Sequence, residues 1–327
     1  MVRIYLDWGA IAPKNPPANF DPTNPADPAY DFSDADLQVK LAVRDGLQPI
    51  LAAVDAPSWA EGSSAGLNVA DSQPGTVRPD PKAFGQFMLA AARRYSGRFH
   101  GLPRVRYWQV WIEPNVDFEL SPQFQIGPTQ WATLQTPMLS PEIYRGLVNA
   151  FAASVHRVHR DNLVVAGGLS PFFNPYPGAR TAAPMPFMRQ LLCMSAANRP
   201  LPHCNRVSFD IWGMDPYTAG NPEHHANNPV DVSFGDLPRM GALLRAAYKA
   251  HHIISPHPPQ FWISEFAWDS NPPDPYGVPV ALETRWVAEA IYRAWTDGIT
   301  LFTWFETTDE TRQGGFQAGL YYACPSG

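Results

Sequence analysis

Short apolar runs alternate along the chain with longer stretches in which apolar residues recur every three or four positions. The runs have the length of buried strands and lie at Val2–Leu6, Leu47–Val54, Val105–Ile112, Leu163–Gly168, Val207–Trp212, Gln260–Ser264 and Ile299–Phe305. The stretches with helical spacing lie at Phe84–Tyr95, Tyr144–Val158, Phe187–Ala196, Leu237–Tyr248 and Leu282–Trp295, with a weaker one at Asp34–Val43. This alternation predicts parallel strands joined by right-handed crossovers.

The segments between these elements are unequal in length, and the inequality indicates the architecture. Segments that follow the apolar runs are long and irregular, such as 9–33, 56–79 and 114–140, whereas those that precede the runs are short. A barrel with its site at the carboxyl ends of its strands has this asymmetry. The first run is not followed by the G-x-G-x-x-G of a dinucleotide-binding sheet. We therefore expect a single α/β domain over residues 1–327, a (β/α)₈ (TIM) barrel, in preference to a doubly wound sheet.

Composition limits the classes of ligand that this barrel could bind. The net charge of −6 provides no basic surface for nucleic acid or an anionic membrane, and no apolar run reaches the ~18 residues of a membrane helix. Aromatic residues make up 13% of the chain and include 11 tryptophans. Most are expected in the core, but flat aromatic faces also suit ligands with apolar C–H faces, such as sugars.

Two glutamates stand out because each closes an apolar run that contains no other acid. Glu113 ends the run Tyr107-Trp-Gln-Val-Trp-Ile-Glu and precedes Pro114, which cannot donate to a strand ladder. Glu265 ends Phe261-Trp-Ile-Ser-Glu in the same way. An ordinary salt-bridged or loop-facing role is open for either one alone, but two such carboxylates at one barrel mouth favour a catalytic pair. Glycosidic cleavage needs such a pair, one protonated to assist the leaving oxygen and one ionised.

Both glutamate motifs resemble those of a known group of enzymes. Trp111-Ile-Glu-Pro-Asn115 is similar to the Trp-Asn-Glu-Pro-(Asn) motif of the clan A retaining glycoside hydrolases, cellulase-like and β-xylosidase-like barrels, and Ile263-Ser-Glu-Phe-Ala-Trp268 resembles their second motif. In that clan the acid/base glutamate ends the fourth strand and the nucleophile ends the seventh; two apolar runs separate Glu113 from Glu265 here. The resemblance implies a retaining hydrolase acting on a β-linked glycoside, oligosaccharide or polysaccharide. Glu265 would be the nucleophile and Glu113 the acid/base, without metal or organic cofactor.

The resemblance extends to residues that would contact the nucleophile or the sugar. Arg3 resembles the clan's arginine that steadies the nucleophile, with an ordinary ion pair as the alternative. Tyr217 resembles its tyrosine that hydrogen-bonds the nucleophile, with a surface tyrosine as the alternative. Trp304 is similar to the tryptophan that floors the sugar subsite, with core packing as the alternative. The expected substrate-binding set is completed by three residues that follow strands, namely Trp8, Trp59 and Asn115.

Two departures from the clan pattern leave a second function open. Ile112 stands where the clan has an asparagine that contacts the sugar 2-hydroxyl, and an aliphatic side chain cannot make that contact. Only two apolar runs precede Glu113, so the clan's first strand and helix, as well as its last helix, are expected to be missing. We thus expect a barrel truncated at both ends, with seven strands and a gap between the strand that bears Arg3 and the strand that bears Trp304. The alternative function is a non-catalytic carbohydrate-binding barrel. A signal peptide is not present in this chain; a truncated chain would lack one in any case, so the localisation, extracellular export included, stays open.

Overall fold

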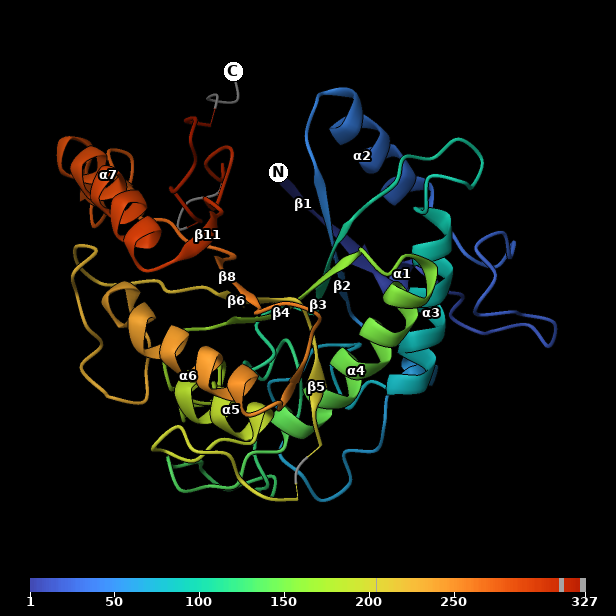
Figure 1. Ribbon diagram of the computed structural model, residues 1–327, viewed down its shortest axis with the longest axis horizontal. Helices are drawn as coiled ribbons and strands as arrows, with labels where there is room; N and C mark the ends of the chain where they lie inside the picture. Colours follow the sequence, from blue (N-terminus) through green and yellow to red (C-terminus); the bar gives the residue numbers. More distant parts are fainter. Residues whose placement is uncertain (204, 312–314, 324–327) are drawn as a thin grey trace.

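A curled parallel sheet, covered on its outer face by helices, forms the frame of the molecule in the computed structural model, which describes residues 1–203, 205–311 and 315–323 (Figure 1). The sheet has seven strands in the order β1-β2-β3-β4-β6-β8-β11, and all of its neighbouring pairs are parallel. The strands are β1 (Val2–Asp7), β2 (Pro49–Val54), β3 (Tyr107–Val110), β4 (Leu163–Leu169), β6 (Ile211–Met214), β8 (Gln260–Ile263) and β11 (Ile299–Phe302). The predicted α/β fold, a partial TIM barrel, is confirmed.

Helices connect successive strands, as the apolar spacing predicted. They are α2 (Ser33–Arg44), α3 (Pro81–Arg94), α4 (Ser140–Val158), α5 (Pro184–Leu192), α6 (Leu237–Lys249) and α7 (Val280–Thr296), with short helical turns at α1 (Trp8–Ile11), η1 (Ser58–Ala60) and η2 (Phe234–Asp236). The Asp80 carboxylate caps α3 by accepting the Ala83 amide at 2.7 Å. Gly298, which follows α7, has a φ of +81°, a value that a side chain would disfavour. No helix in the described part of the chain is both long and apolar enough to cross a membrane.

Small strand pairs lie outside the barrel sheet. The apolar run at 207–212 is divided, since β5 (Val207–Ser208) pairs with β7 (Ile253–Ile254) and only the following strand, β6, joins the barrel. A second pair consists of β9 (Ser270–Asn271) and β10 (Val278–Pro279). The barrel strand predicted at 207–212 therefore began too early in the chain, because that run includes β5 as well as the start of β6.

The strands that carry the two glutamates end earlier than predicted. β3 stops at Val110, since Trp111 and Glu113 have φ values of +62° and +33°, which residues with side chains rarely adopt. Glu113 thus lies in the loop after β3, and Glu265 lies in the loop after β8. Both remain at the carboxyl ends of their strands.

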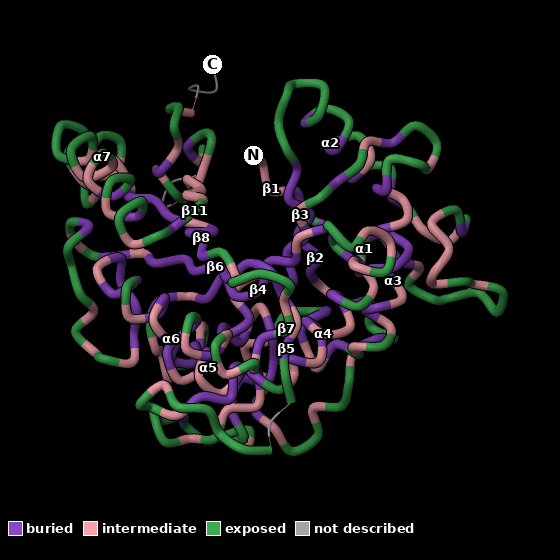
Figure 2. Tube along the Cα trace, viewed as in Figure 1, coloured by how far each residue is buried: buried purple, intermediate pink, exposed green. Residues whose placement is uncertain are grey.

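The main core lies between the sheet and the helices (Figure 2). β1 illustrates how alternation sorts the side chains: Ile4 and Leu6 are 3% and 0% exposed and belong to this core, whereas Tyr5 is 44% exposed. A smaller cluster of Ile50, Val165, Ile211 and Trp262 fills the concave side of the sheet. Polar side chains lie at the carboxyl ends of the strands.

The barrel sheet does not close. β1 and β11 are its two edges, and no described strand pairs with both of them. Figure 1 shows β1 with α2 on one side of the opening and β11 with α7 on the other. No helix follows β11 within residues 303–311 and 315–323. The predicted strand count and the predicted gap are therefore confirmed for the described residues.

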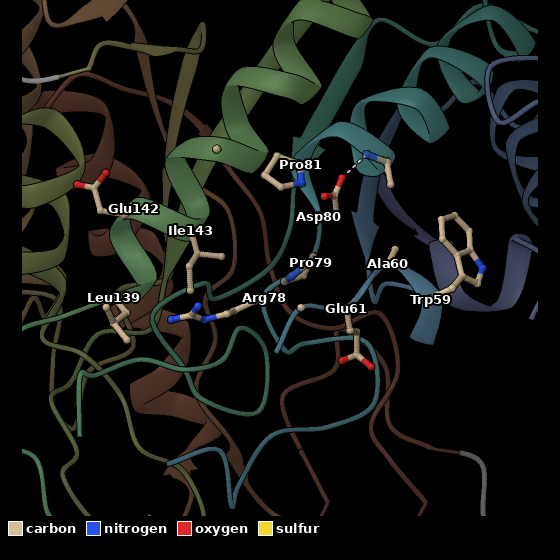
Figure 3. A pocket seen from close by; sticks show the side chains of 13 residues that line it. Trp59, Ala60, Glu61, Arg78, Pro79, Asp80, Pro81, Leu139, Glu142 and Ile143 are labelled. Carbon is tan, nitrogen blue, oxygen red and sulfur yellow. Dashed lines mark hydrogen bonds between the residues drawn. The ribbon is translucent and has the colours of Figure 1, made fainter. Parts of the chain in front are cut away.

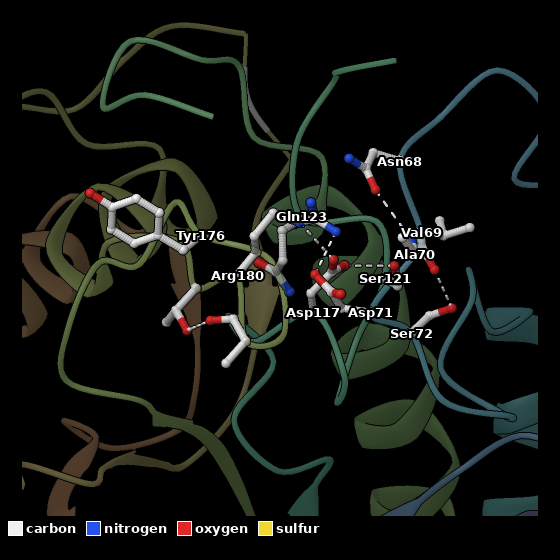
Figure 4. A network of polar contacts seen from close by, with 12 residues as sticks. Asn68, Val69, Ala70, Asp71, Ser72, Asp117, Ser121, Gln123, Tyr176 and Arg180 are labelled. Atoms are coloured by element: carbon white, nitrogen blue, oxygen red, sulfur yellow. Dashed lines mark hydrogen bonds and ion pairs between the residues drawn. The ribbon is translucent and has the colours of Figure 1, made fainter. Parts of the chain in front are cut away.

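The long loops at the carboxyl ends of the strands are tied together by buried ion pairs (Figure 4). Arg180, in the loop after β4, pairs with Asp71 in the loop after β2 at 2.5 Å and with Asp117 in the loop after β3 at 3.3 Å. Asp117 also accepts a 2.7 Å hydrogen bond from the Ser121 hydroxyl. Separation of the loops would leave a buried charge unpaired, so these ion pairs hold the three loops together.

Candidate active site

Glu265 is held by two donors that come from different strands. The Tyr217 hydroxyl donates to Glu265 Oε1 at 2.9 Å, and Arg3 Nη2 donates a charge-assisted hydrogen bond to Oε2. The Arg3 and Glu265 side chains are only 11% and 14% exposed, so this ion pair is weakly screened by solvent. Arg3 lies on the edge strand β1 and Tyr217 follows β6. Three residues far apart in the sequence are thus in direct contact.

Glu113 lies at the same end of the sheet but in a different environment. The neighbouring Ser170 side chain acts to lower the pKa of its carboxyl group. Burial, together with the negative charges of Glu265 and Glu119, raises the pKa of Glu113 to about 8. This environment therefore favours the protonated form of Glu113. Its φ of +33° is an unfavourable backbone conformation of the kind that collects at functional sites.

Asn115 supports this arrangement from within the protein. The side chain is 0% exposed, and its Nδ2 donates to the carbonyls of Ser170 and Ala182 at 2.9 Å each. Its Oδ1 accepts the Ser170 amide at 2.9 Å. The expectation that Asn115 binds substrate is wrong, because both ends of the amide are buried and bonded to backbone. Asn115 instead positions Ser170, the residue that contacts Glu113.

Trp8 and Trp59 differ from the expectation in different ways. Trp8 is 0% exposed and stacks on Phe87 with 5.7 Å between ring centroids. The expectation that Trp8 stacks on a sugar is therefore wrong, since the core encloses its ring. Trp59 is 37% exposed and packs edge-on with Trp8 at 5.9 Å, but it lines a pocket other than the cavity at the strand ends.

Trp304 lies in an aromatic cluster with Phe266 and Trp268, which closely follow Glu265 in the sequence. Its ring centroid is 6.4 Å from that of Phe266 and 6.3 Å from that of Trp268, and its Nε1 donates to the Ala318 carbonyl at 2.7 Å. The side chain is partly exposed. Its role as the floor of a sugar subsite stays a prediction.

A cavity of about 290 Å³ lies at the carboxyl ends of β1, β2 and β3, and we call it the mouth cavity. It is lined by Tyr5, Asp7, Val54, Asp55, Ile112 and Glu119. Burial, reinforced by nearby carboxylates, raises the pKa of Asp55 to about 6 and that of Glu119 to about 7. The sequence reasoning missed Asp55, although this residue follows an apolar run just as Glu113 and Glu265 do.

Asp215 is a second residue that the sequence reasoning missed. It follows β6, is 0% exposed, and accepts a 2.5 Å hydrogen bond at Oδ1 from Ser264, the neighbour of Glu265. Burial and the charges of Glu265 and Glu113 raise the pKa of Asp215 well above its usual value. Gly213 makes this approach possible, because a Cβ there would lie 2.7 Å from Ser264 Oγ. Asp215 therefore fixes the Ser264 side chain, next to Glu265.

The polar groups of the site are carboxyl, hydroxyl and guanidinium groups. Within residues 1–203, 205–311 and 315–323, no group of three or more His, Cys, Asp or Glu side chains is arranged to hold a metal ion. The arrangement can donate a proton from one carboxyl group and present a second, oriented carboxylate to a ligand.

Comparison with known proteins bears on the fold. No model of a protein family matches the chain, and no curated protein sequence matches it. Among solved structures, the chain is similar to a family 39 glycoside hydrolase from the gut symbiont Bacteroides cellulosilyticus WH2, with a TM-score of 0.57 and 16% identity over 98% of this chain and 54% of that one. It is also similar to a monomeric β-xylosidase from Caulobacter crescentus CB15, with a TM-score of 0.56 and 15% identity over 90% of this chain and 53% of that one.

A structure of fungal β-1,4-galactanases is similar at a TM-score of 0.50 and 14% identity, covering 94% of this chain and 77% of that one. The solved structures that the chain resembles are thus glycoside hydrolases, and at these identities the likeness shows a shared barrel fold. The chain spans about half the length of the family 39 enzyme and of the β-xylosidase, at 54% and 53%.

Proposed function

We propose that the protein is a retaining glycoside hydrolase that cleaves β-glycosidic bonds by double displacement. The observation that carries this proposal is the contrast between two neighbouring carboxyl groups. Glu265 receives hydrogen bonds from Arg3 and Tyr217 on its two oxygens, whereas burial raises the pKa of Glu113 to about 8. Two carboxyl groups in such different environments are suited to the roles of nucleophile and acid.

In the first step, a Glu265 carboxylate oxygen attacks the anomeric carbon, and the bond from this carbon to the leaving oxygen breaks. Glu113 transfers its proton to that oxygen, so the aglycone leaves as an alcohol. In the second step, Glu113 accepts a proton from water, the water oxygen bonds to the anomeric carbon, and the bond to Glu265 breaks. Both carboxyl groups return to their starting states, and the product keeps the β configuration because each step inverts it.

Ser170 and Asn115 fit this mechanism as positioning residues. The Ser170 side chain acts on Glu113, and Asn115 holds Ser170 through two hydrogen bonds to its backbone and makes a third to the Ala182 carbonyl of the same loop. A fixed acid is needed because proton transfer depends on the distance to the leaving oxygen. We expect the two carboxyl groups to be separated by about 5–5.5 Å, the spacing of a retaining pair.

A non-catalytic carbohydrate-binding protein is the second candidate function. The observation that favours it is Ile112, which lines the mouth cavity and offers a sugar no hydrogen bond. The Arg3–Glu265–Tyr217 arrangement favours the enzyme, since binding of a neutral sugar does not require a buried ion pair with a tyrosine on the same carboxylate.

The test is chemical rescue of the two glutamate variants. Wild type is first assayed on a panel of aryl β-glycosides. Glu265→Ala should then abolish turnover, and azide should restore it with an α-glycosyl azide as product. Glu113→Ala should retain activity on substrates with good leaving groups, and azide should give a β-glycosyl azide. The opposite stereochemistry of the two products distinguishes the nucleophile from the acid/base.

Glu289→Ala serves as the matched control, because the Glu289 side chain is 37% exposed on α7 and pairs with Arg293 on the same helix. Its activity should equal that of wild type. No turnover of any glycoside by wild type, combined with saturable sugar binding, would establish the binding protein instead of the enzyme.

A further inference from the structure

A second pocket lies outside the mouth cavity, between η1 and the first turns of α3 and α4 (Figure 3). Its volume is about 570 Å³, within the range of sites that enclose a small ligand. It shares no lining residue with the mouth cavity. We call it the outer pocket. Its lining combines one exposed tryptophan, apolar side chains and a guanidinium that has no partner among the described residues.

The guanidinium belongs to Arg78. Its side chain makes no hydrogen bond or ion pair with any residue that the structure describes, and its Nε is buried without a partner. Figure 3 shows the side chain extending toward Leu139 and Ile143. The backbone of Arg78 has a φ of +45°, an unfavourable value for a residue with a side chain. A buried donor without a partner on a strained residue calls for an explanation, and a ligand with acceptor oxygens supplies one.

The acids around the outer pocket are already engaged. Glu61 Oε1 accepts the amides of Gly75 and Val77 at 2.9 and 3.0 Å, and Asp80 caps α3. Glu142 pairs with Arg145. Among the described residues of the pocket, Arg78 therefore has a guanidinium available to a ligand. The three carboxylates make the outer pocket unfavourable for an anion. Neutral oxygen acceptors fit this balance of charges.

Trp59 supplies a fixed aromatic surface to the same pocket. Its Nε1 donates to the Pro13 carbonyl at 2.8 Å, and its ring packs against Trp8, yet 37% of the side chain is exposed. An indole held in this way loses little conformational entropy when a ligand packs on it. Aromatic surface, aliphatic side chains and a planar fork of donors together match a sugar ring, which has apolar C–H faces and equatorial oxygens.

We propose that the outer pocket binds a neutral segment of a glycan chain, apart from the sugar that Glu113 and Glu265 would contact. Arg78 donates hydrogen bonds to hydroxyl and ring oxygens, and Trp59 packs against a sugar face. The choice of a glycan rests on the proposed function, since the cleaved bond would lie at Glu113 and Glu265, at the carboxyl ends of the strands. The consequence is a substrate that is an oligosaccharide or polysaccharide instead of a small glycoside.

Calorimetric titration of a Glu265→Gln background, in which turnover is removed, tests the outer pocket. The probes are neutral β-1,4-linked oligosaccharides of glucose, xylose, mannose and galactose with four to six units. At least one is expected to bind saturably, and adding Arg78→Met should weaken that binding at least tenfold or remove one site. Arg98→Met is the matched control, because Arg98 is exposed at the other end of α3 and its side chain makes no hydrogen bond with a described residue. Thermal melting of each variant verifies folding.

Equal binding with and without Arg78→Met would overturn the proposal, and so would binding confined to oligosaccharides of uronic acids or no binding at all. The two proposals fail separately. Arg78-dependent binding without hydrolysis of any glycoside by wild type would remove the enzyme and keep the outer pocket. Hydrolysis with binding that is independent of Arg78 would do the reverse.

Discussion

α4 and α7 are helices of similar length and similar amphipathic pattern, but they are packed very differently. α4 lies against the middle of the sheet and buries most of its apolar residues, including Leu147 and Phe151. In α7, at the open edge, only Ala290 and Ala294 are buried, while Ile291 and Trp295 are 53% and 71% exposed (Figure 2). The comparison teaches that an apolar stripe indicates which residues share a face, whereas closure of the sheet decides whether that face is covered.

The candidate site spans both regions. Glu113 follows β3 in the packed middle, and its support comes from the neighbouring loops through Ser170 and Asn115. The support of Glu265 includes Arg3, which lies on the edge strand β1. Glu113 and Glu265, the proposed acid and nucleophile, therefore depend on regions of different packing.

The largest expected effect concerns stability on the two helices. Leu147→Ala in α4 should lower the free energy of unfolding by about 2–5 kcal/mol, because a fully buried side chain leaves a cavity. Ile291→Ala in α7 removes a side chain of the same size from the surface and should change stability by less than about 0.5 kcal/mol. Urea denaturation measures both. Equal losses would mean that α7 is covered in solution.

A second prediction concerns the edge strand. Arg3→Met should reduce kcat/KM by about 100-fold, since the nucleophile loses one of its two donors. Arg44→Met is the control, because Arg44 is exposed at the end of α2 and pairs only with its neighbour Asp45. Hydrogen exchange of the β1 amides, followed in the same variant, should become faster. An unchanged kcat/KM would show that the edge does not support the nucleophile.

A third prediction concerns Glu113 in the packed region. The expected effect on activity is smaller, about tenfold per pH unit. Burial raises the pKa of Glu113 to about 8, so activity should fall as pH rises above this value and the acid loses its proton. Glu113→Gln should remove that limb of the profile. Since the folded state holds the proton more tightly than the unfolded chain, Glu113 stabilises the fold most at low pH. This contribution should decline between pH 4.5 and 8. A limb near pH 5 would contradict the buried environment.

The smallest effect is expected at Ile112, which lines the mouth cavity. If no other residue binds the 2-hydroxyl, Ile112→Asn should raise kcat a few-fold on substrates with an equatorial 2-hydroxyl and leave 2-deoxy substrates unchanged. Paired kinetics on the two substrates measure the difference. A tenfold loss, about 1.4 kcal/mol, would show that the isoleucine fits a different arrangement.

The sequence was sufficient to predict the order of strands and the position of the gap, because parallel strands at this spacing leave few other topologies. Glu113 and Glu265 were found from the rule that an acid after an apolar strand lies at the mouth. The same rule would have identified Asp55, had it been applied to every strand.

Burial could not be predicted for Trp8 and Asn115. Both follow strands, as a ligand-binding residue would, yet Trp8 is enclosed by Phe84 and Phe87 and Asn115 by two loops. Those neighbours are distant in the sequence, and periodicity within one element carries no information about them. Arg78 was missed for the opposite reason, since its significance lies in the absence of a described partner, which only the assembled loops reveal.

The ion pair between Arg3 and Glu265 joins the first strand of the open sheet to the loop after its sixth. Its length therefore depends on how tightly the whole sheet is curled, and a slight flattening would draw the guanidinium away from the carboxylate. With Glu265 as the proposed nucleophile, the catalytic rate would depend on this curvature. A molecule that separates the edge strands β1 and β11 would inhibit the enzyme without contacting the mouth cavity. A molecule that holds these two strands closer together would activate it.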